Sequence, residues 1–187
     1  YVRAISGNPD AAMSDLNYAI RLEPDDPAAY ASRAKARYEM ADWEGTIADY
    51  SRAIQLKPQS ADYWCERGNA RIMKGDYDAA LADLKHAVTL APDEAVNRFT
   101  QGFAYLKKGD VDKALADFNE ALRLDPELAE AYRERGHALS FKGQLDKALA
   151  DIGKALELIP DDYEAVLCRG YTMSLKGDLN KAIADFN

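Results

Sequence analysis

The chain has 187 residues, of which 48% are hydrophobic and 30% are charged, and its net charge at pH 7 is −8. This share of apolar residues is sufficient for a continuous core, which excludes an intrinsically disordered chain. The 32 acidic residues outnumber the 24 basic ones along the whole sequence. We therefore expect no nucleic-acid partner, because a phosphate backbone requires a basic surface. No run of 18 apolar residues occurs, so we also expect no contact with a membrane through a spanning helix.

A motif of 34 residues repeats along the sequence. Residues 7–24 and 41–58 are loose copies of it. Closer copies read GDYDAALADLKHAVTLAP at 75–92, GDVDKALADFNEALRLDP at 109–126, GQLDKALADIGKALELIP at 143–160 and, cut short, GDLNKAIADFN at 177–187. A fixed period of this length is typical of stacked-repeat proteins. We interpret residues 1–187 as one array: a partial repeat 1–26, full repeats 27–60, 61–94, 95–128 and 129–162, and a partial repeat 163–187.

The ends of the sequence fall inside repeats. Tyr1 lies in mid-repeat and is not a methionine, and Asn187 lies within an expected helix. We interpret the chain as a piece of a longer protein, whose targeting segment would lie outside it. On this basis we assign no compartment.

Each repeat is predicted to hold two helices of about 14 residues joined by a short turn. Asp26, which precedes Pro27, is a typical helix N-cap, and Ser60 and Asp162 stand at equivalent positions. The first helices are expected to end near a lysine, followed by a glycine that can adopt the left-handed conformation: Gly75, Gly109, Gly143 and Gly177. Prolines then stop the second helices.

Small residues recur where the two helices of a repeat should cross. Gly68, Gly102, Gly136 and Gly170 lie in mid-helix, where glycine costs about 1 kcal/mol relative to alanine, so a packing requirement is indicated. The facing column is Ala12, Ala80, Ala114, Ala148 and Ala182. Aromatic residues accompany both columns and are expected in the core: Tyr30, Trp64 and Tyr132 on first helices, and Tyr50, Phe118 and Phe186 on second helices. Arg98 interrupts the first of these aromatic columns.

These residues resemble the tetratricopeptide repeat (TPR), and the resemblance covers the whole chain. It implies an all-α fold, a right-handed α-solenoid (superhelix) of stacked antiparallel helix pairs with a 34-residue period. The RG…ADF variety is similar to many bacterial repeat proteins. In it, an arginine column (Arg33, Arg67, Arg135, Arg169, with Gln101 in the odd repeat) accompanies an aspartate column (Asp15, Asp49, Asp83, Asp117, Asp151, Asp185). We expect these columns to form contacts between helices, either within a repeat or with the preceding one.

The sequence contains no catalytic or metal-binding pattern. His86 and His137 lie on different repeats, with no cluster of cysteines, histidines or acids at metal-ligand spacing, and no phosphate-binding glycine loop occurs. Cys65 and Cys168 are three repeats apart, so we expect no disulfide between them. We therefore predict a non-enzyme without a cofactor.

The resemblance further implies a concave groove, lined by first helices, that holds a peptide or a partner's segment. The candidate groove residues are Glu66, Asn69, Phe99, Phe103, Arg133, Glu134, His137 and Tyr171, with Phe141 in the wider lining. We expect the aromatic members to form a continuous stripe. A lining that is apolar with acidic edges suits a protein or peptide of apolar or basic character. The residues do not reproduce the clamp with which some family members hold a carboxylate.

Two other functions remain open from the sequence. The array could be a spacer or a rod that self-associates through its repeat ends. It could also be the regulatory arm of a longer enzyme, since the fold does not decide the function.

Overall fold

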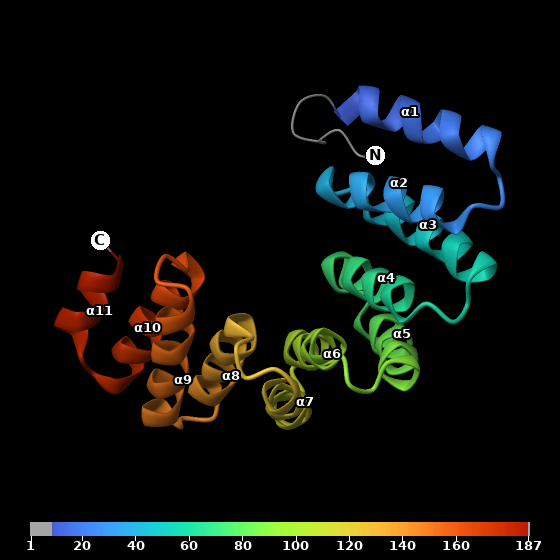
Figure 1. The fold of residues 1–187 in the computed structure, drawn as a ribbon. Helices are drawn as coiled ribbons and strands as arrows, with labels where there is room; N and C mark the ends of the chain where they lie inside the picture. The colour runs from blue at the N-terminus through green and yellow to red at the C-terminus, as the bar shows by residue number, and fades with distance from the viewer. Residues whose placement is uncertain (1–8, 187) are drawn as a thin grey trace. The chain divides into compact units, whose positions relative to one another are not determined.

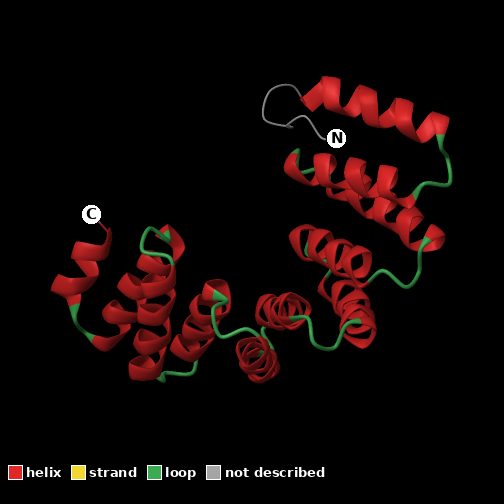
Figure 2. Ribbon diagram, viewed as in Figure 1, coloured by secondary structure: helices red, strands yellow, loops and turns green. Residues whose placement is uncertain are grey.

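The computed structural model describes the backbone of residues 9–186, and all side chains in that span except those of residues 9–11, 181, 184 and 186. The predicted core residue Phe186 thus lies outside the described side chains. The chain divides into two compact units, Tyr1–Pro92 (unit 1) and Asp93–Asn187 (unit 2). Helices joined by short turns make up the described backbone, which contains no strand (Figure 2).

Unit 1 is a stack of helices in chain order (Figure 1). They are α1 (Pro9–Leu22), α2 (Pro27–Glu39), α3 (Trp43–Leu56), α4 (Ala61–Lys74) and α5 (Tyr77–Leu90). Helices α2 and α3 form one antiparallel pair, α4 and α5 form the next, and α3 packs on α4.

Unit 2 repeats this arrangement with α6 (Ala95–Lys108), α7 (Val111–Leu124), α8 (Ala129–Phe141), α9 (Leu145–Leu158), α10 (Tyr163–Lys176) and α11 (Leu179–Phe186). The pairs are α6 with α7, α8 with α9 and α10 with α11. The first helices also contact one another, α6 with α8 and α8 with α10, so they form one side of the stack.

Local signals set the helix ends. The Asp26 carboxylate accepts a hydrogen bond from the Ala28 amide at 2.9 Å, and Asp162 accepts one from Ala165 at 3.0 Å, which confirms both N-caps. Ser60 occupies the N-cap of α4, as predicted, although its side chain makes no capping hydrogen bond. Gly75, Gly109, Gly143 and Gly177 have φ between 70° and 91°, as predicted. Ala41 takes the same left-handed conformation, with φ 56°, in the turn between α2 and α3.

The crossing glycines lie against the second helix of their own pair. A Cβ atom at Gly68, Gly102 or Gly136 would lie 2.8, 2.9 or 2.7 Å from Leu84, Phe118 or Ile152, respectively. The facing alanines Ala80, Ala114 and Ala148 are fully buried. Steric exclusion therefore accounts for glycine in the middle of these helices.

The two aromatic columns have different environments. Tyr50 and Phe118 on second helices are buried in the core, as predicted. The first-helix aromatics are only half-buried, and they stack beneath arginines: Arg67 lies over Trp64 at 4.9 Å and Arg135 over Tyr132 at 5.5 Å. The indole Nε1 of Trp64 also donates to the Pro58 carbonyl at 2.8 Å. The hydroxyl of Tyr30 donates in the same way to the Pro24 carbonyl at 3.1 Å, so these two aromatic residues tie the start of their helix to the end of the preceding repeat.

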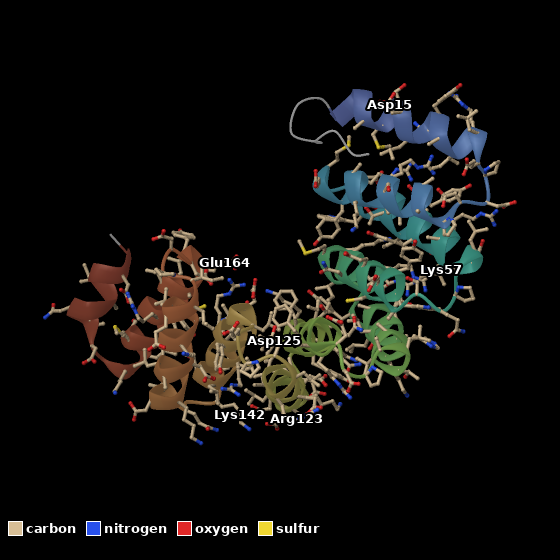
Figure 3. All side chains as sticks on the ribbon, viewed as in Figure 1. Asp15, Lys57, Arg123, Asp125, Lys142 and Glu164 are labelled. Atoms are coloured by element: carbon tan, nitrogen blue, oxygen red, sulfur yellow. The ribbon has the colours of Figure 1, made fainter. Side chains whose placement is uncertain are left out.

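Exposed ion pairs link successive helix pairs. Lys74 at the end of α4 lies 3.3 Å from Glu44 on α3, and Lys176 lies 2.5 Å from Asp146 on α9. Lys142, which is labelled in Figure 3, pairs with Asp112 on α7. In each case the lysine lies at the end of a first helix and the acid belongs to the preceding second helix. Exposed pairs of this kind contribute about 0–1 kcal/mol each, so they set register more than stability.

Candidate functional site

Arginine and aspartate columns form the main polar network of both units. Arg33 donates to Asp49 through Nε at 2.8 Å and through Nη2 at 2.6 Å. The same two-pronged geometry joins Arg67 to Asp83, Arg135 to Asp151 and Arg169 to Asp185, at 2.6–2.9 Å. Contacts between the columns are thus confirmed, and each runs between the two helices of one pair.

A third contact extends this network to the preceding helix pair. The Nη1 atom of Arg33 donates to Asn17 at 2.7 Å, that of Arg67 to Ser51 at 2.9 Å, and that of Arg135 to Asn119 at 2.8 Å. Each of these arginines therefore bridges three helices. Because these bonds all lie inside the stack, we assign the column a structural role.

The candidate groove residues all lie on first helices. Glu66 and Asn69 are on α4, Phe99 and Phe103 on α6, Arg133, Glu134 and His137 on α8, and Tyr171 on α10. The members on α6, α8 and α10 belong to unit 2, and those on α4 belong to unit 1.

Phe99 and Phe103 are half-buried and support the core. Their ring centroids are 6.3 Å apart, and both pack against the buried cluster that contains Ala114 and Phe118. Lys107 lies over the Phe103 ring at 4.8 Å. These two rings are therefore partly covered by the core and are only partly exposed on the first-helix surface.

A second aromatic group lies on α8 and α10. The His137 ring lies 4.7 Å from Phe141 and 6.5 Å from Tyr171. Phe141 is 56% exposed, Leu175 48% and Tyr171 41%. Leu175, which sequence reasoning missed, stands one repeat after Phe141 and could have been found from that spacing. The predicted continuous stripe thus consists of two groups of ring contacts among the described residues, one on α6 and one on α8 and α10.

Arg133 and Glu134 are engaged with each other and with neighbouring charges. Arg133 lies 3.3 Å from Glu134, 3.0 Å from Asp162 and 2.8 Å from Glu164. Burial opposes ionisation of Glu134, but the interactions of its carboxylate with nearby His137 and Arg133 outweigh that effect, so the pKa of Glu134 is lowered. Glu134 is therefore ionised at neutral pH, and its negative charge is compensated within the protein.

Glu66 has a different environment on α4. Burial raises its pKa, and Lys35 offsets only part of this effect through its charge. Burial also raises the pKa of the nearby Tyr38 hydroxyl, and Asn69 opposes that rise. Glu66 is thus a half-buried carboxylate whose charged and titratable neighbours are Lys35, Asp62, Tyr38 and Tyr50.

No reactive centre emerges from the part of the chain that the structure describes. Burial, assisted by the Glu134 charge, raises the pKa of the Cys168 thiol to about 11, so it is a poor nucleophile at neutral pH. The side chains that the structure describes include no group of three histidine, cysteine or acidic residues that could hold a metal ion. None of the helices described is long and apolar enough to cross a membrane.

One hollow of about 440 Å³ lies between α7, α8 and α9 in unit 2. Its lining is Leu115, Asn119, Arg135, Leu139, Gln144, Lys147, Ala150 and Asp151. Arg135, Asn119 and Asp151 bind one another there, so its polar groups already serve the helix network.

Comparison with protein families gives a consistent assignment for this architecture. Models of the tetratricopeptide repeat match residues 34–102 and 129–162, and a TPR repeat model matches residues 102–140. The chain belongs to the tetratricopeptide repeat family. Membership of the TPR family supports a role as a protein-interaction scaffold, and it confirms the sequence-based assignment.

Solved structures confirm the all-α TPR fold. YrrB, a TPR protein with an unusual peptide-binding site, is 24% identical with a TM-score of 0.67, over 93% of this chain and 90% of that chain. PilW, a type IV pilus biogenesis factor, is 18% identical with a TM-score of 0.86, over 95% and 82% of the two chains. TTC0263, a thermophilic TPR protein from Thermus thermophilus, is 24% identical with a TM-score of 0.73, over 95% and 92%. No curated protein sequence matched the chain.

Proposed function

We propose that this protein is a non-catalytic scaffold that holds an apolar segment of a partner protein on its first-helix surface. The observation that carries the proposal is an exposed apolar surface on α8 and α10, made of His137, Phe141, Tyr171 and Leu175, which we call the α8/α10 patch. Single exposed apolar residues are common on soluble proteins, but contiguous ones mark interaction sites. His137 and Phe141 lie one turn apart on α8, and Tyr171 and Leu175 lie one turn apart on α10. The two helices are in contact.

The chemistry of the patch indicates what the partner segment presents. Two aromatic rings and a leucine offer a surface for an apolar or aromatic side chain, and His137 lies between the rings. Beside the patch, Arg133 pairs with Glu134, Asp162 and Glu164, so its positive charge is already engaged within the protein. Phe99 and Phe103 extend the surface on α6 and stiffen it through their contact with the core. An extended or helical segment with one or two large apolar residues would fit it.

The test removes the exposed rings and leaves the core intact. Affinity capture with the wild-type protein would supply a partner, whose binding is then measured by isothermal titration with purified components. The double variant Phe141→Ser, Tyr171→Ser should bind at least about 2 kcal/mol more weakly, as expected for buried anchors. A thermal melt followed by circular dichroism would show that the variant remains folded.

A matched control is available on α1. Tyr18 and Leu22 are 56% and 64% exposed, comparable to the patch residues, but lie outside the first helices. The variant Tyr18→Ser, Leu22→Ser should bind like the wild type. Unchanged partner binding by the folded α8/α10 variant would exclude the patch as the docking surface.

A further inference from the structure

Glu66 and Glu134 occupy the same position of two repeats but have opposite charge environments. Arg133 lies 3.3 Å from Glu134 and His137 lies 3.9 Å from it. The residues at the corresponding positions around Glu66 are Cys65 and Asn69, neither of which carries a positive charge. Within the described part of the chain, Glu66 forms no ion pair, and Lys35 acts on it only as a nearby charge. Glu66 therefore has a nearby lysine but lacks the ion-paired cation that Arg133 supplies to Glu134.

A buried hydroxyl without a hydrogen-bond partner among the described residues lies near Glu66. Tyr50 is 1% exposed, and its hydroxyl oxygen has no hydrogen-bond partner among the described residues. Its titratable neighbours are Glu66, Tyr63, Cys65 and Tyr38, and the Tyr63 ring centroid lies 6.4 Å from that of Tyr50. The same column carries leucine, phenylalanine and isoleucine in the later repeats, so the hydroxyl is particular to this repeat. Native proteins pair nearly all of their buried polar groups, so this hydroxyl marks the cluster as unusual.

We infer that Glu66 forms a cation-binding subsite on the first-helix surface of unit 1, which takes a lysine or arginine side chain from the partner segment. The partner's cation would form an ion pair with Glu66, as Arg133 does with Glu134. The half-buried carboxylate would gain a charge-assisted hydrogen bond that offsets its loss of hydration. The tyrosine rings of Tyr38 and Tyr63 would contact the aliphatic stem and attract the cationic head. This inference rests on the proposed function, because it assumes that first-helix surfaces receive partner segments.

The test uses a defined pair of probes that differ in charge alone. The peptides acetyl-Gly-Arg-Gly-amide and acetyl-Gly-citrulline-Gly-amide would be titrated into isotopically labelled wild-type protein and followed by NMR. The arginine peptide should shift the Glu66 side-chain carboxyl signal saturably. It should bind at least about tenfold more tightly than the citrulline peptide, a difference of about 1.4 kcal/mol. Equal affinity for the two peptides, or a Glu66 signal that does not respond, would overturn the inference.

Variants locate the binding site. Glu66→Gln should weaken binding of the arginine peptide to the level of the citrulline peptide. Glu164→Gln removes an exposed carboxylate from α10 in unit 2 (Figure 3) and should leave binding unchanged. The Glu66 signal of the wild-type protein supplies an answer that does not depend on how the variants fold. Full binding of the arginine peptide by Glu66→Gln would place the site elsewhere and refute the assignment.

Failure of this inference is distinguishable from failure of the proposed function. The probe peptides carry no large apolar residue, so they test Glu66 without the α8/α10 patch. Partner binding that requires Phe141 and Tyr171, with no arginine binding at Glu66, would refute only the subsite. Arginine binding at Glu66, with partner binding unaffected by the patch variant, would refute only the patch.

Discussion

The Arg98 guanidinium donates to the Asp117 carboxylate at 3.4 Å, across the α6 and α7 pair. The usual arginine of this network is replaced by Gln101, and Arg98 lies one helical turn earlier, where other repeats carry an aromatic residue. With its amide nitrogen facing Asp117, Gln101 donates to the same carboxylate at 3.2 and 3.3 Å. The displaced arginine thus compensates for the missing one and explains the interruption of the aromatic column. Arg98 binds Asp117 with fewer hydrogen bonds than the usual arginine makes to its aspartate, because the buried Nε of Arg98 has no partner among the described residues.

Removal of Arg98 should destabilise the protein in a pH-dependent way. Burial raises the pKa of Asp117, and Arg98 opposes that rise. Arg98→Met should lower the free energy of unfolding by about 1–2 kcal/mol at pH 7, because it leaves a buried carboxylate without its cation. The loss should disappear below the unfolded pKa of aspartate, about 3.9, since a protonated carboxyl needs no cation. Urea denaturation at pH 7 and at low pH would measure both effects. Arg123→Met, which removes an exposed pair with Glu120, is the control and should cost much less.

Arg169 lacks the third contact made by the other arginines of its column. Gly153 stands where Asn17, Ser51 and Asn119 supply an acceptor in the other repeats, and a Cβ atom at Gly153 would meet nothing within 4 Å. Gly153→Asn should raise the free energy of unfolding by about 1 kcal/mol, through a new bond to Arg169 and better helix propensity. In an Arg169→Met background only the propensity gain should remain. A gain from Gly153→Asn that is the same in both backgrounds would show that no bond to Arg169 forms.

Gly136 and Gly153 should respond in opposite directions to the same substitution. A Cβ at Gly136 would lie 2.7 Å from Ile152 and 3.0 Å from the Ala148 carbonyl oxygen, so the two helices would have to separate. Gly136→Ala should lower the free energy of unfolding by about 1–3 kcal/mol, and Gly136→Leu by more. Gly153→Ala, in open space, should raise it by about 1 kcal/mol. Thermal melts of the three variants would measure the direction of each stability change. A Gly136→Leu melting temperature equal to that of the wild type would exclude close packing as the reason for this glycine.

Ala41 is strained by its left-handed backbone. Its φ of 56° is unfavourable for a residue with a Cβ atom, and glycine stands at this turn in the later repeats. Ala41→Gly should stabilise the protein by about 0.5–1 kcal/mol, because the relief of strain exceeds the added flexibility of the unfolded chain. The reverse change, Gly75→Ala at φ 89°, should destabilise by a similar amount. Chemical denaturation midpoints would test the pair, and a loss of stability in Ala41→Gly would contradict the strain argument.

Glu66 and Glu134 should affect stability with opposite signs. The raised pKa of Glu66 means that its ionised form is disfavoured by folding, so Glu66→Gln should stabilise the protein at pH 7. That gain should vanish as the pH falls below the unfolded pKa of glutamate. The lowered pKa of Glu134 means that its ionised form stabilises the folded state, so Glu134→Gln should destabilise at pH 7, with a loss that shrinks as the pH falls through the folded pKa. Unfolding curves at pH 7 and pH 4 would check both, and equal effects of the two substitutions would contradict the assigned environments.

The amino-acid sequence by itself determined the repeat length, the helix pairs, the left-handed glycines and the small residues at each crossing. These features are readable because they depend on local conformation or on a column that every repeat shares. Gly136 and Ala148, for example, are identifiable from spacing alone.

Only the tertiary structure decided which partner each side chain has. Arg135 could have paired with Asp151 or Asp117, and the distance of 2.6 Å selects Asp151. Glu134 looked like a free acidic residue of the groove, but it is neutralised by Arg133 on the same helix. Equivalent positions share a backbone environment but not their neighbours' side chains. The charge state and availability of Glu66 and Glu134 therefore depend on contacts that no repeat pattern specifies.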